Sequence, residues 1–190
     1  TIMNINDKLH KNNSPIKEIE IPYKDFLKKG NDVLDFDPVK FDADDTAVIV
    51  YTGGTTGTPK GVELTNKNFN AVVQGYKNSK IDFNKGDSFL HFLPPWTAYG
   101  MVIYYLLYQT GVKCIFIPKL DPATYDKLIL RERPNHTTGI PKNLDILLGS
   151  KNIKANTDLS FFKTAAVGAD TMNINTEMKV NTFLDKHGSC

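Results

Sequence analysis

Eleven residues at positions 51–61 carry the clearest chemical signal in the chain: Tyr-Thr-Gly-Gly-Thr-Thr-Gly-Thr-Pro-Lys-Gly. Four glycines and four threonines leave little side chain to bury, and the run loses much backbone entropy if it packs. It offers instead backbone N–H groups, hydroxyls and the single ammonium group of Lys60. Phosphate oxygens accept hydrogen bonds from such groups, so the run predicts a phosphate-binding loop.

The spacing around Lys60 distinguishes this loop from a Walker-type P-loop. That pattern needs Gly-Lys followed by Ser or Thr and then a helix. Here Lys60 lies between Pro59 and Gly61, and a strand-like pattern follows it. We therefore expect the loop to join two strands and to fold over a nucleotide. Composition alone also allows a Gly/Thr linker without function, but strand patterns flank both ends.

Composition excludes several other classes of function. The 190 residues include 23 Lys and Arg against 21 Asp and Glu, and the lysines are dispersed, so no basic face for nucleic acid is predicted. The longest apolar run, residues 101–108, is far shorter than the roughly 20 residues of a membrane span. Two cysteines form neither a disulfide framework nor a zinc cluster, which favours a reducing, cytoplasmic compartment. The four histidines lack metal-ligand spacing and are expected to be packed or at the surface, and Cys114 is expected to act as a small hydrophobe.

The pattern of predicted elements indicates an α/β fold. Strands are predicted over residues 47–51, 61–65, 88–93, 112–117, 136–140 and 161–167, and helices over 23–29, 66–80, 99–109, 122–131, 141–148 and 174–186. The continuous apolar run 47–51 is expected to be buried on both faces. Strands separated by helices of about 10 to 15 residues indicate a mainly parallel sheet flanked by helices. Residues 1–45 are interpreted as a poorly ordered lead-in and an approach loop, and residues 46–190 as the domain.

The stretch AVIVYTGGTTGTPKGVELTN, residues 47–66, resembles the phosphate-loop signature of the adenylate-forming superfamily. That superfamily includes acyl-CoA synthetases, adenylation domains and luciferases, and its members often have Ser where this chain has Gly53. The resemblance implies that the loop wraps the triphosphate of ATP, that Lys60 is catalytic and steadies the departing pyrophosphate, and that Thr52 lies near the Mg²⁺ ion. The implied loop residues are Thr52, Gly53, Gly54, Thr55, Thr56, Gly57, Thr58, Pro59, Lys60 and Gly61.

The segment 93–100, Leu-Pro-Pro-Trp-Thr-Ala-Tyr-Gly, resembles the substrate-pocket segment of the same family. The resemblance implies that Trp96, Thr97, Tyr99 and Gly100 contact the acid substrate. Amino-acid-activating members usually carry an aspartate at the position of Thr97, because an ammonium group in a dry pocket needs an anionic partner. Thr97 cannot supply that charge, which favours a plain carboxylic acid. Ordinary core packing is the alternative for Trp96 and Tyr99.

The segment 166–170, Ala-Val-Gly-Ala-Asp, resembles the turn where the family seats adenine. Gly168, Ala169 and Asp170 are therefore implied to bind the nucleotide, since small residues let a purine ring approach the backbone. A plain strand-end turn is the alternative. The run Gly139-Ile140-Pro141 resembles a strand-to-helix turn of the family and is expected to be structural.

The resemblance implies an ATP-dependent ligase of fatty acid metabolism that forms an acyl-adenylate and then acyl-CoA. ATP, Mg²⁺, coenzyme A and a carboxylic acid are its implied cofactors and substrates. Family members are several hundred residues longer, so we expect a fragment of the large N-terminal domain, truncated at both ends and inactive alone. Two alternatives stay open: a fragment of an aryl or amino-acid adenylation domain, and a non-catalytic nucleotide-binding α/β module. The acid, the thiol acceptor and the oligomeric state are left open.

Overall fold

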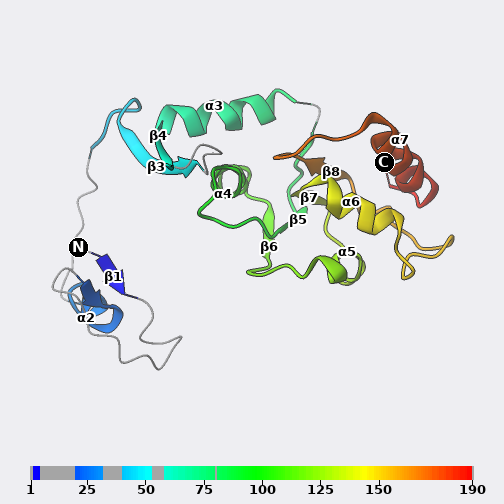
Figure 1. Cartoon of the computed structure of the whole chain (residues 1–190), viewed down its shortest axis with the longest axis horizontal. Coiled ribbons are helices and arrows are strands. Elements are labelled where there is room, and N and C mark those ends of the chain that lie inside the picture. Colours follow the sequence, from blue (N-terminus) through cyan, green and yellow to red (C-terminus); the bar gives the residue numbers. More distant parts are fainter. Residues whose placement is uncertain (1, 5–19, 32–39, 53–57, 80, 190) are drawn as a thin grey trace. The chain divides into compact units, whose positions relative to one another are not determined.

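The computed structural model describes residues 2–4, 20–31, 40–52, 58–79 and 81–189 (Figure 1). Its contacts divide the chain into two compact units, Thr1–Phe41 and Asp42–Cys190. In the first unit, strand β1 (Ile2–Asn4) pairs in parallel with β2 (Glu20–Pro22), and helix α2 (Tyr23–Lys28) follows directly. The sequence predicted the helix but neither strand, because runs of three residues carry no readable period.

The second unit begins with an antiparallel hairpin of β3 (Thr46–Thr52) and β4 (Lys60–Thr65). Thr52 and Lys60 form its last described pair, so the glycine- and threonine-rich loop joins two strands, as predicted. Helix α3 (Asn66–Lys77) follows β4 without a loop. It begins with a capping box in which Thr65 Oγ1 accepts from the Asn68 N–H at 3.3 Å and Asn68 Oδ1 accepts from the Thr65 N–H at 2.9 Å.

The expectation that β3 is buried on both faces is wrong. Only Val50 is buried in this strand, whereas the side chains of Ile49 and Tyr51 are 51% and 70% exposed. Among the described strands β3 pairs only with β4, so it does not lie inside a sheet covered by helices on both faces. Its apolar composition reflects high β propensity as much as burial.

The second unit also contains a four-stranded parallel sheet with the order β6-β5-β7-β8. The strands are β5 (Ser88–His91), β6 (Lys113–Phe116), β7 (His136–Gly139) and β8 (Thr164–Val167). Helices α4 (Ala98–Thr110), α5 (Tyr125–Glu132) and α6 (Pro141–Leu148) connect successive strands, and α7 (Ile174–Lys186) follows β8. A short 3₁₀ turn, Pro122–Thr124, precedes α5 and is capped by Asp121. The predicted parallel sheet flanked by helices is confirmed.

Two hydrophobic clusters cover the two faces of this sheet. Phe89 and Leu90 are adjacent on β5 and therefore point to opposite faces. Phe89 packs in one cluster with residues of α3 and α4, and Leu90 packs in the other with residues of α5, α6 and α7. The sheet is thus buried at its centre.

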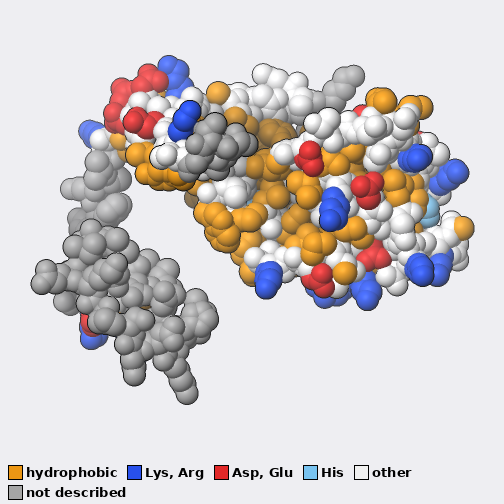
Figure 2. All heavy atoms as spheres, in the orientation of Figure 1, with side chains coloured by type: hydrophobic (Ala, Val, Ile, Leu, Met, Phe, Trp, Pro, Cys, Tyr) orange, Lys and Arg blue, Asp and Glu red, His pale blue; other side chains and the backbone are white. Residues whose placement is uncertain are grey.

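The expectation that Cys114 is packed as a small hydrophobe is wrong. The sequence placed Cys114 inside an apolar strand as a small hydrophobe, but its side chain is exposed. Among the described strands β6 pairs only with β5, and none of its four residues is fully buried. Charged side chains of both signs are dispersed among hydrophobic ones on the face of the second unit seen in Figure 2. No helix among the described residues has the length and hydrophobicity needed to cross a membrane.

Candidate functional site

The carboxyl ends of the parallel strands bring two of the predicted segments to one edge of the sheet. The segment with Trp96, Thr97, Tyr99 and Gly100 follows β5, and the turn with Gly168, Ala169 and Asp170 follows β8. Strand β7 lies between β5 and β8. In open α/β sheets, ligands bind in the crevice outside the carboxyl ends of the strands. We refer to this edge as the carboxyl edge.

Tyr99 joins the two segments. Its hydroxyl forms a hydrogen bond with Oγ1 of Thr138 on β7. Its ring lies so close to Gly168 that a Cβ built on this glycine would be 2.9 Å from both the Cζ and the hydroxyl oxygen of Tyr99. Gly168 in turn donates its N–H to the Gly139 carbonyl at 3.0 Å. The structure therefore places a predicted acid-binding residue against a predicted nucleotide-binding residue.

Sequence reasoning missed Thr138. Its side chain is 1% exposed, and its strand carries two threonines in a fully buried stretch of four residues. A buried hydroxyl needs a hydrogen-bond partner, so consecutive threonines in a short buried strand were the available signal. The partner itself lies 39 residues away in the sequence and could not be named from it.

Thr97 and Gly100 have clear roles in local structure. Thr97 is the N-cap of α4: its Oγ1 accepts from the Gly100 N–H at 3.1 Å and donates to the Pro94 carbonyl at 2.8 Å. A Cβ on Gly100 would stand 2.0 Å from the Pro94 carbonyl oxygen, so only glycine fits there. Trp96 is 74% exposed, which rules out core packing for this residue in the structure.

The turn after β8 has an unusual backbone. Ala169 has φ 64°, in the left-handed region that a residue with a Cβ adopts at a cost of about 1 kcal/mol. Such conformations concentrate at functional turns. Asp170 is exposed, and one of its carboxylate oxygens accepts from the Thr171 N–H at 2.7 Å. The turn thus presents small residues and backbone groups at the carboxyl edge, as a flat purine ring would require.

The end of the β3–β4 hairpin presents the described part of the lysine loop. Thr52 Oγ1 lies 3.5 Å from the Lys60 carbonyl oxygen, and Thr52, Thr58, Pro59, Lys60 and Gly61 are all exposed. The predicted loop residues Gly53, Gly54, Thr55, Thr56 and Gly57 lie outside the described residues. Within the described part of the chain, the Lys60 ammonium forms no ion pair, and no hydrogen bond joins Lys60 to the carboxyl edge.

The proximity of Thr52 to Mg²⁺ stays a prediction. The residues that the structure describes include no group of three or more His, Cys, Asp or Glu side chains that could hold a metal ion. Mg²⁺ in proteins is usually bound by one or two carboxylates together with substrate phosphates and water. Thr52 offers one neutral oxygen, so an Mg²⁺ ion near it would take most of its ligands from substrate phosphates and water.

Two buried histidines were expected to be packed rather than catalytic, and the structure confirms this. His136 Nε2 lies 2.9 Å from Asp87 Oδ2 at the amino edge of the sheet, opposite the candidate site. His91 on β5 is fully buried against the edge of Tyr104, at 4.2 Å between ring centroids. Neither ring nitrogen of His91 has a hydrogen-bond partner among the residues that the structure describes, and burial lowers the pKa of His91 to about 4.

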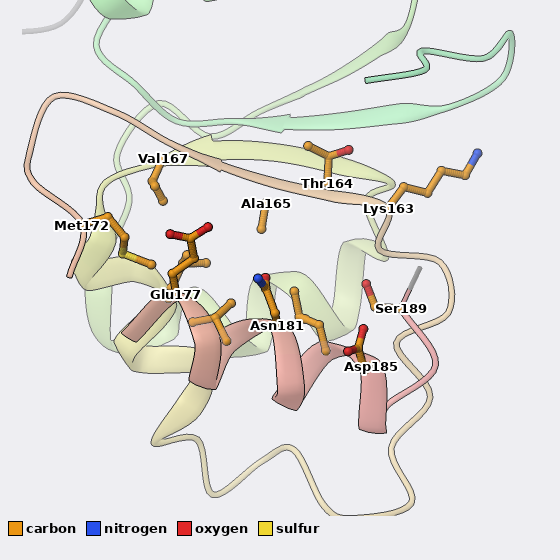
Figure 3. Close-up of a pocket in the computed structure, with 12 residues that line it drawn as sticks. Lys163, Thr164, Ala165, Val167, Met172, Glu177, Asn181, Asp185 and Ser189 are labelled. Carbon is orange, nitrogen blue, oxygen red and sulfur yellow. The ribbon is translucent and has the colours of Figure 1, made fainter. Parts of the chain in front are cut away.

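A described cavity lies elsewhere, between β8 and α7 (Figure 3). It has a volume of about 400 Å³ and none of the predicted site residues lines it. Glu177, Asn181 and Asp185 are spaced four residues apart on α7 and point from one face of the helix towards β8. Strand β8 pairs only with β7 among the described strands, so this groove runs along its free edge. We refer to it as the α7–β8 groove.

A family model and curated relatives both match most of this chain. The model of the family described as "AMP-binding enzyme" matches residues 4–187. The chain is 35% identical over 116 residues to the Arabidopsis thaliana chloroplastic long-chain-fatty-acid–[acyl-carrier-protein] ligase AEE15, covering 60% of this chain and 15% of that protein. It is 33% identical over 138 residues to the long-chain-fatty-acid–CoA ligase of Bacillus subtilis, covering 71% of this chain and 24% of that one.

The fold is also that of a solved structure, the inhibitor-bound N-terminal domain of FACL13 from Mycobacterium tuberculosis. The TM-score is 0.72 with 24% sequence identity, and the match covers 87% of this chain and 41% of that domain. The chain spans about a quarter or less of the length of the two curated relatives. The family model covers nearly the whole chain, including the lysine loop and both segments of the carboxyl edge, and the chain therefore belongs to the AMP-binding enzyme family.

Proposed function

We propose that the natural gene product containing this chain is an ATP-dependent acid–thiol ligase, an AMP-forming acyl-CoA synthetase. The observation that carries the proposal is the hairpin of β3 and β4. It ends in Thr52 and Lys60, and an exposed lysine without an ion pair in the described part of the chain stands beside a loop of glycines and threonines. The ammonium group and the loop N–H groups of such a hairpin can bind a polyphosphate. The ligase activities in the printed names of the relatives agree with it.

The proposed reaction has two steps. In the first, a carboxylate oxygen of the acid attacks the α-phosphorus of ATP, the bond from that phosphorus to the bridging oxygen breaks, and pyrophosphate leaves. In the second, the sulfur of a thiol attacks the carbonyl carbon of the acyl-adenylate, AMP leaves, and the thiol proton is released. Attacking and leaving groups in the first step are both anions, so neutralisation of their charge dominates the barrier.

Each segment has a defined part in this proposal. Lys60 and the N–H groups of the loop neutralise the β- and γ-phosphates as pyrophosphate departs, and the turn at Gly168, Ala169 and Asp170 seats adenine. Mg²⁺ would accompany ATP as part of the substrate and would neutralise phosphate charge, Thr52 would offer it one neutral oxygen, and coenzyme A is the thiol. Because the chain spans about a quarter or less of the length of the two curated relatives, we propose that the 190-residue chain alone does not catalyse the reaction.

The acid substrate is proposed to be a plain carboxylic acid. The Thr97 hydroxyl is occupied by the N-cap of α4, and Thr97 carries no negative charge for an ammonium group. An amino acid would leave its ammonium group without an anionic partner at this position. The fatty acids in the printed names of both curated relatives support an aliphatic acid.

The test is pyrophosphate exchange into ATP by the full-length gene product, with Lys60→Ala and a matched control. Lys67→Ala is suitable as the control, because Lys67 is also exposed and its partner, Asp44 at 3.1 Å, is exposed too. We expect acid-dependent exchange in the unsubstituted protein, a loss of about 10²-fold or more in Lys60→Ala, and little change in Lys67→Ala. Nucleotide binding without exchange would favour a non-catalytic module. Exchange driven only by an amino acid or an aryl acid would favour an adenylation domain instead.

A further inference from the structure

Tyr99 is restrained from two sides at the carboxyl edge. Its hydroxyl is hydrogen-bonded to Thr138 Oγ1, and its ring fills the space that a side chain at position 168 would occupy. The ring can lie there only because residue 168 is a glycine. Both restraints act at the hydroxyl end of the side chain, one through a hydrogen bond and the other through close packing.

Thr138 is a rigid anchor for the Tyr99 hydroxyl. It lies within β7, where its backbone is in register with Ala166 of β8, and its side chain is 1% exposed. A buried hydroxyl that loses its partner pays a desolvation cost, so the bond to Tyr99 is maintained rather than exchanged with water. The half-buried tyrosine is therefore tied to the centre of the sheet.

The Tyr99 ring stands between the segment proposed to bind the acid and the turn proposed to seat adenine. A displacement of the ring would therefore change the space between these two segments. We propose that Thr138 is a positioning residue for acid selection, which acts by holding the Tyr99 ring against Gly168. This inference rests on the proposed function, because it concerns the acid of that reaction.

The neighbouring residue on β7 supplies a matched control. Thr137 is also 1% exposed and points to the other face of the sheet, where its Oγ1 donates to the Leu90 carbonyl at 3.1 Å. Thr137→Val and Thr138→Val each delete one buried hydroxyl from the same strand with little change in shape. Both are expected to lower stability, but only Thr138→Val releases Tyr99.

The experiment measures kcat/KM in pyrophosphate exchange by the full-length gene product with benzoate and with octanoate as probe acids. The variants are Thr138→Val, Tyr99→Phe, their double variant, Thr138→Ser and Thr137→Val. A released ring makes room for a flat, wide acid. We therefore expect the benzoate-to-octanoate ratio of kcat/KM to rise about three- to tenfold in both single variants, the range that corresponds to one hydrogen bond. The double variant should show no further rise, because both changes delete the same bond.

The control variants separate a positioning role from a structural one. Thr138→Ser keeps the hydroxyl and should retain the ratio of the unsubstituted protein, and Thr137→Val should lower only the melting temperature. An unchanged ratio in Thr138→Val and Tyr99→Phe, or effects that multiply in the double variant, would overturn this inference alone. Absence of acid-dependent exchange in the unsubstituted protein would overturn the proposed function, and this inference with it.

Discussion

The imidazole of His136 and the carboxylate of Asp87 meet at 2.9 Å at the amino edge of the sheet, 49 residues apart in the sequence. Lys163 Nζ lies 2.8 Å from the other oxygen, Oδ1, of the same carboxylate, and the Asn84 N–H donates to Oδ2 at 3.0 Å. Asp87 thereby links the starts of β5, β7 and β8. One buried carboxylate therefore joins the amino ends of the three strands whose carboxyl ends carry the candidate site.

Asp87→Asn should lower the free energy of unfolding by about 2–4 kcal/mol, because it removes a buried charge that accepts charge-assisted hydrogen bonds. Burial would raise the pKa of the Asp87 carboxyl, but the hydrogen bonds from Lys163 and His136 outweigh burial and lower the pKa to about 2. The contribution of Asp87 is therefore present above pH 3.8, its ordinary value, and is lost as the pH falls towards 2. Urea unfolding at pH 7 and pH 3 measures it. Asp82→Asn is the control, since Asp82 is exposed, and an equal loss in both variants would contradict the assignment.

The burial of His91 predicts a second pH dependence of the free energy of unfolding, between pH 4 and pH 6.5. Burial holds its pKa at about 4 in the folded chain, below the ordinary value of 6.5, so the unfolded chain binds a proton that the folded chain does not. Stability should be full above pH 6.5 and should fall as the pH drops from 6.5 to 4, by at most about 1.4 kcal/mol per pH unit. His91→Leu should flatten the curve in this range while leaving the Asp87 range unchanged. A curve of unchanged slope would show that His91 does not titrate as its burial requires.

Gly100→Ala tests the fit between α4 and the segment that precedes it. The added Cβ would stand 2.0 Å from the Pro94 carbonyl oxygen, a backbone atom that cannot rotate away. We expect a loss of about 2–4 kcal/mol in the free energy of unfolding. Gly75→Ala in α3 is the matched control, because nothing lies within 4 Å of its added Cβ and alanine stabilises a helix interior by about 0.5–1 kcal/mol. In thermal unfolding, the melting temperature should fall for Gly100→Ala and rise for Gly75→Ala. Equal shifts of the melting temperature would contradict the close contact between residue 100 and the Pro94 carbonyl.

The N-cap of α3 at Thr65 provides a further test of stability. Thr65→Ala should lower the free energy of unfolding by about 1 kcal/mol, because the Asn68 N–H loses its acceptor. Thr65→Ser keeps the hydroxyl and should restore most of the loss. Circular dichroism during thermal unfolding measures both variants, and equal melting temperatures for the two would contradict the cap.

Local features of the fold could be predicted from the sequence. The caps at Thr65 and Asp121, the proline that begins α6 and the helical period of α7 depend on residues within a few positions of each other. Exposure could not be predicted in the same way. The apolar residues of β3 read as a buried strand, but burial depends on which strands pair beside it, and β3 lies in a two-stranded sheet.

The candidate site was predicted in part. The segments around Tyr99 and Gly168 were identified from their residues, and the parallel sheet brings them to one edge. The hydrogen bond between Tyr99 and Thr138 joins residues 39 positions apart, and the ion pair of Asp87 with Lys163 joins residues 76 positions apart. Such contacts follow from the strand order β6-β5-β7-β8, which no local pattern encodes.

The most direct test of the account is a crystal structure of the full-length gene product with ATP. We predict that the triphosphate contacts the loop between Thr52 and Lys60, with Lys60 Nζ within hydrogen-bond distance of a phosphate oxygen, and that adenine packs against the turn from Gly168 to Asp170. A nucleotide bound away from both segments, for example in the α7–β8 groove, would contradict the central claim.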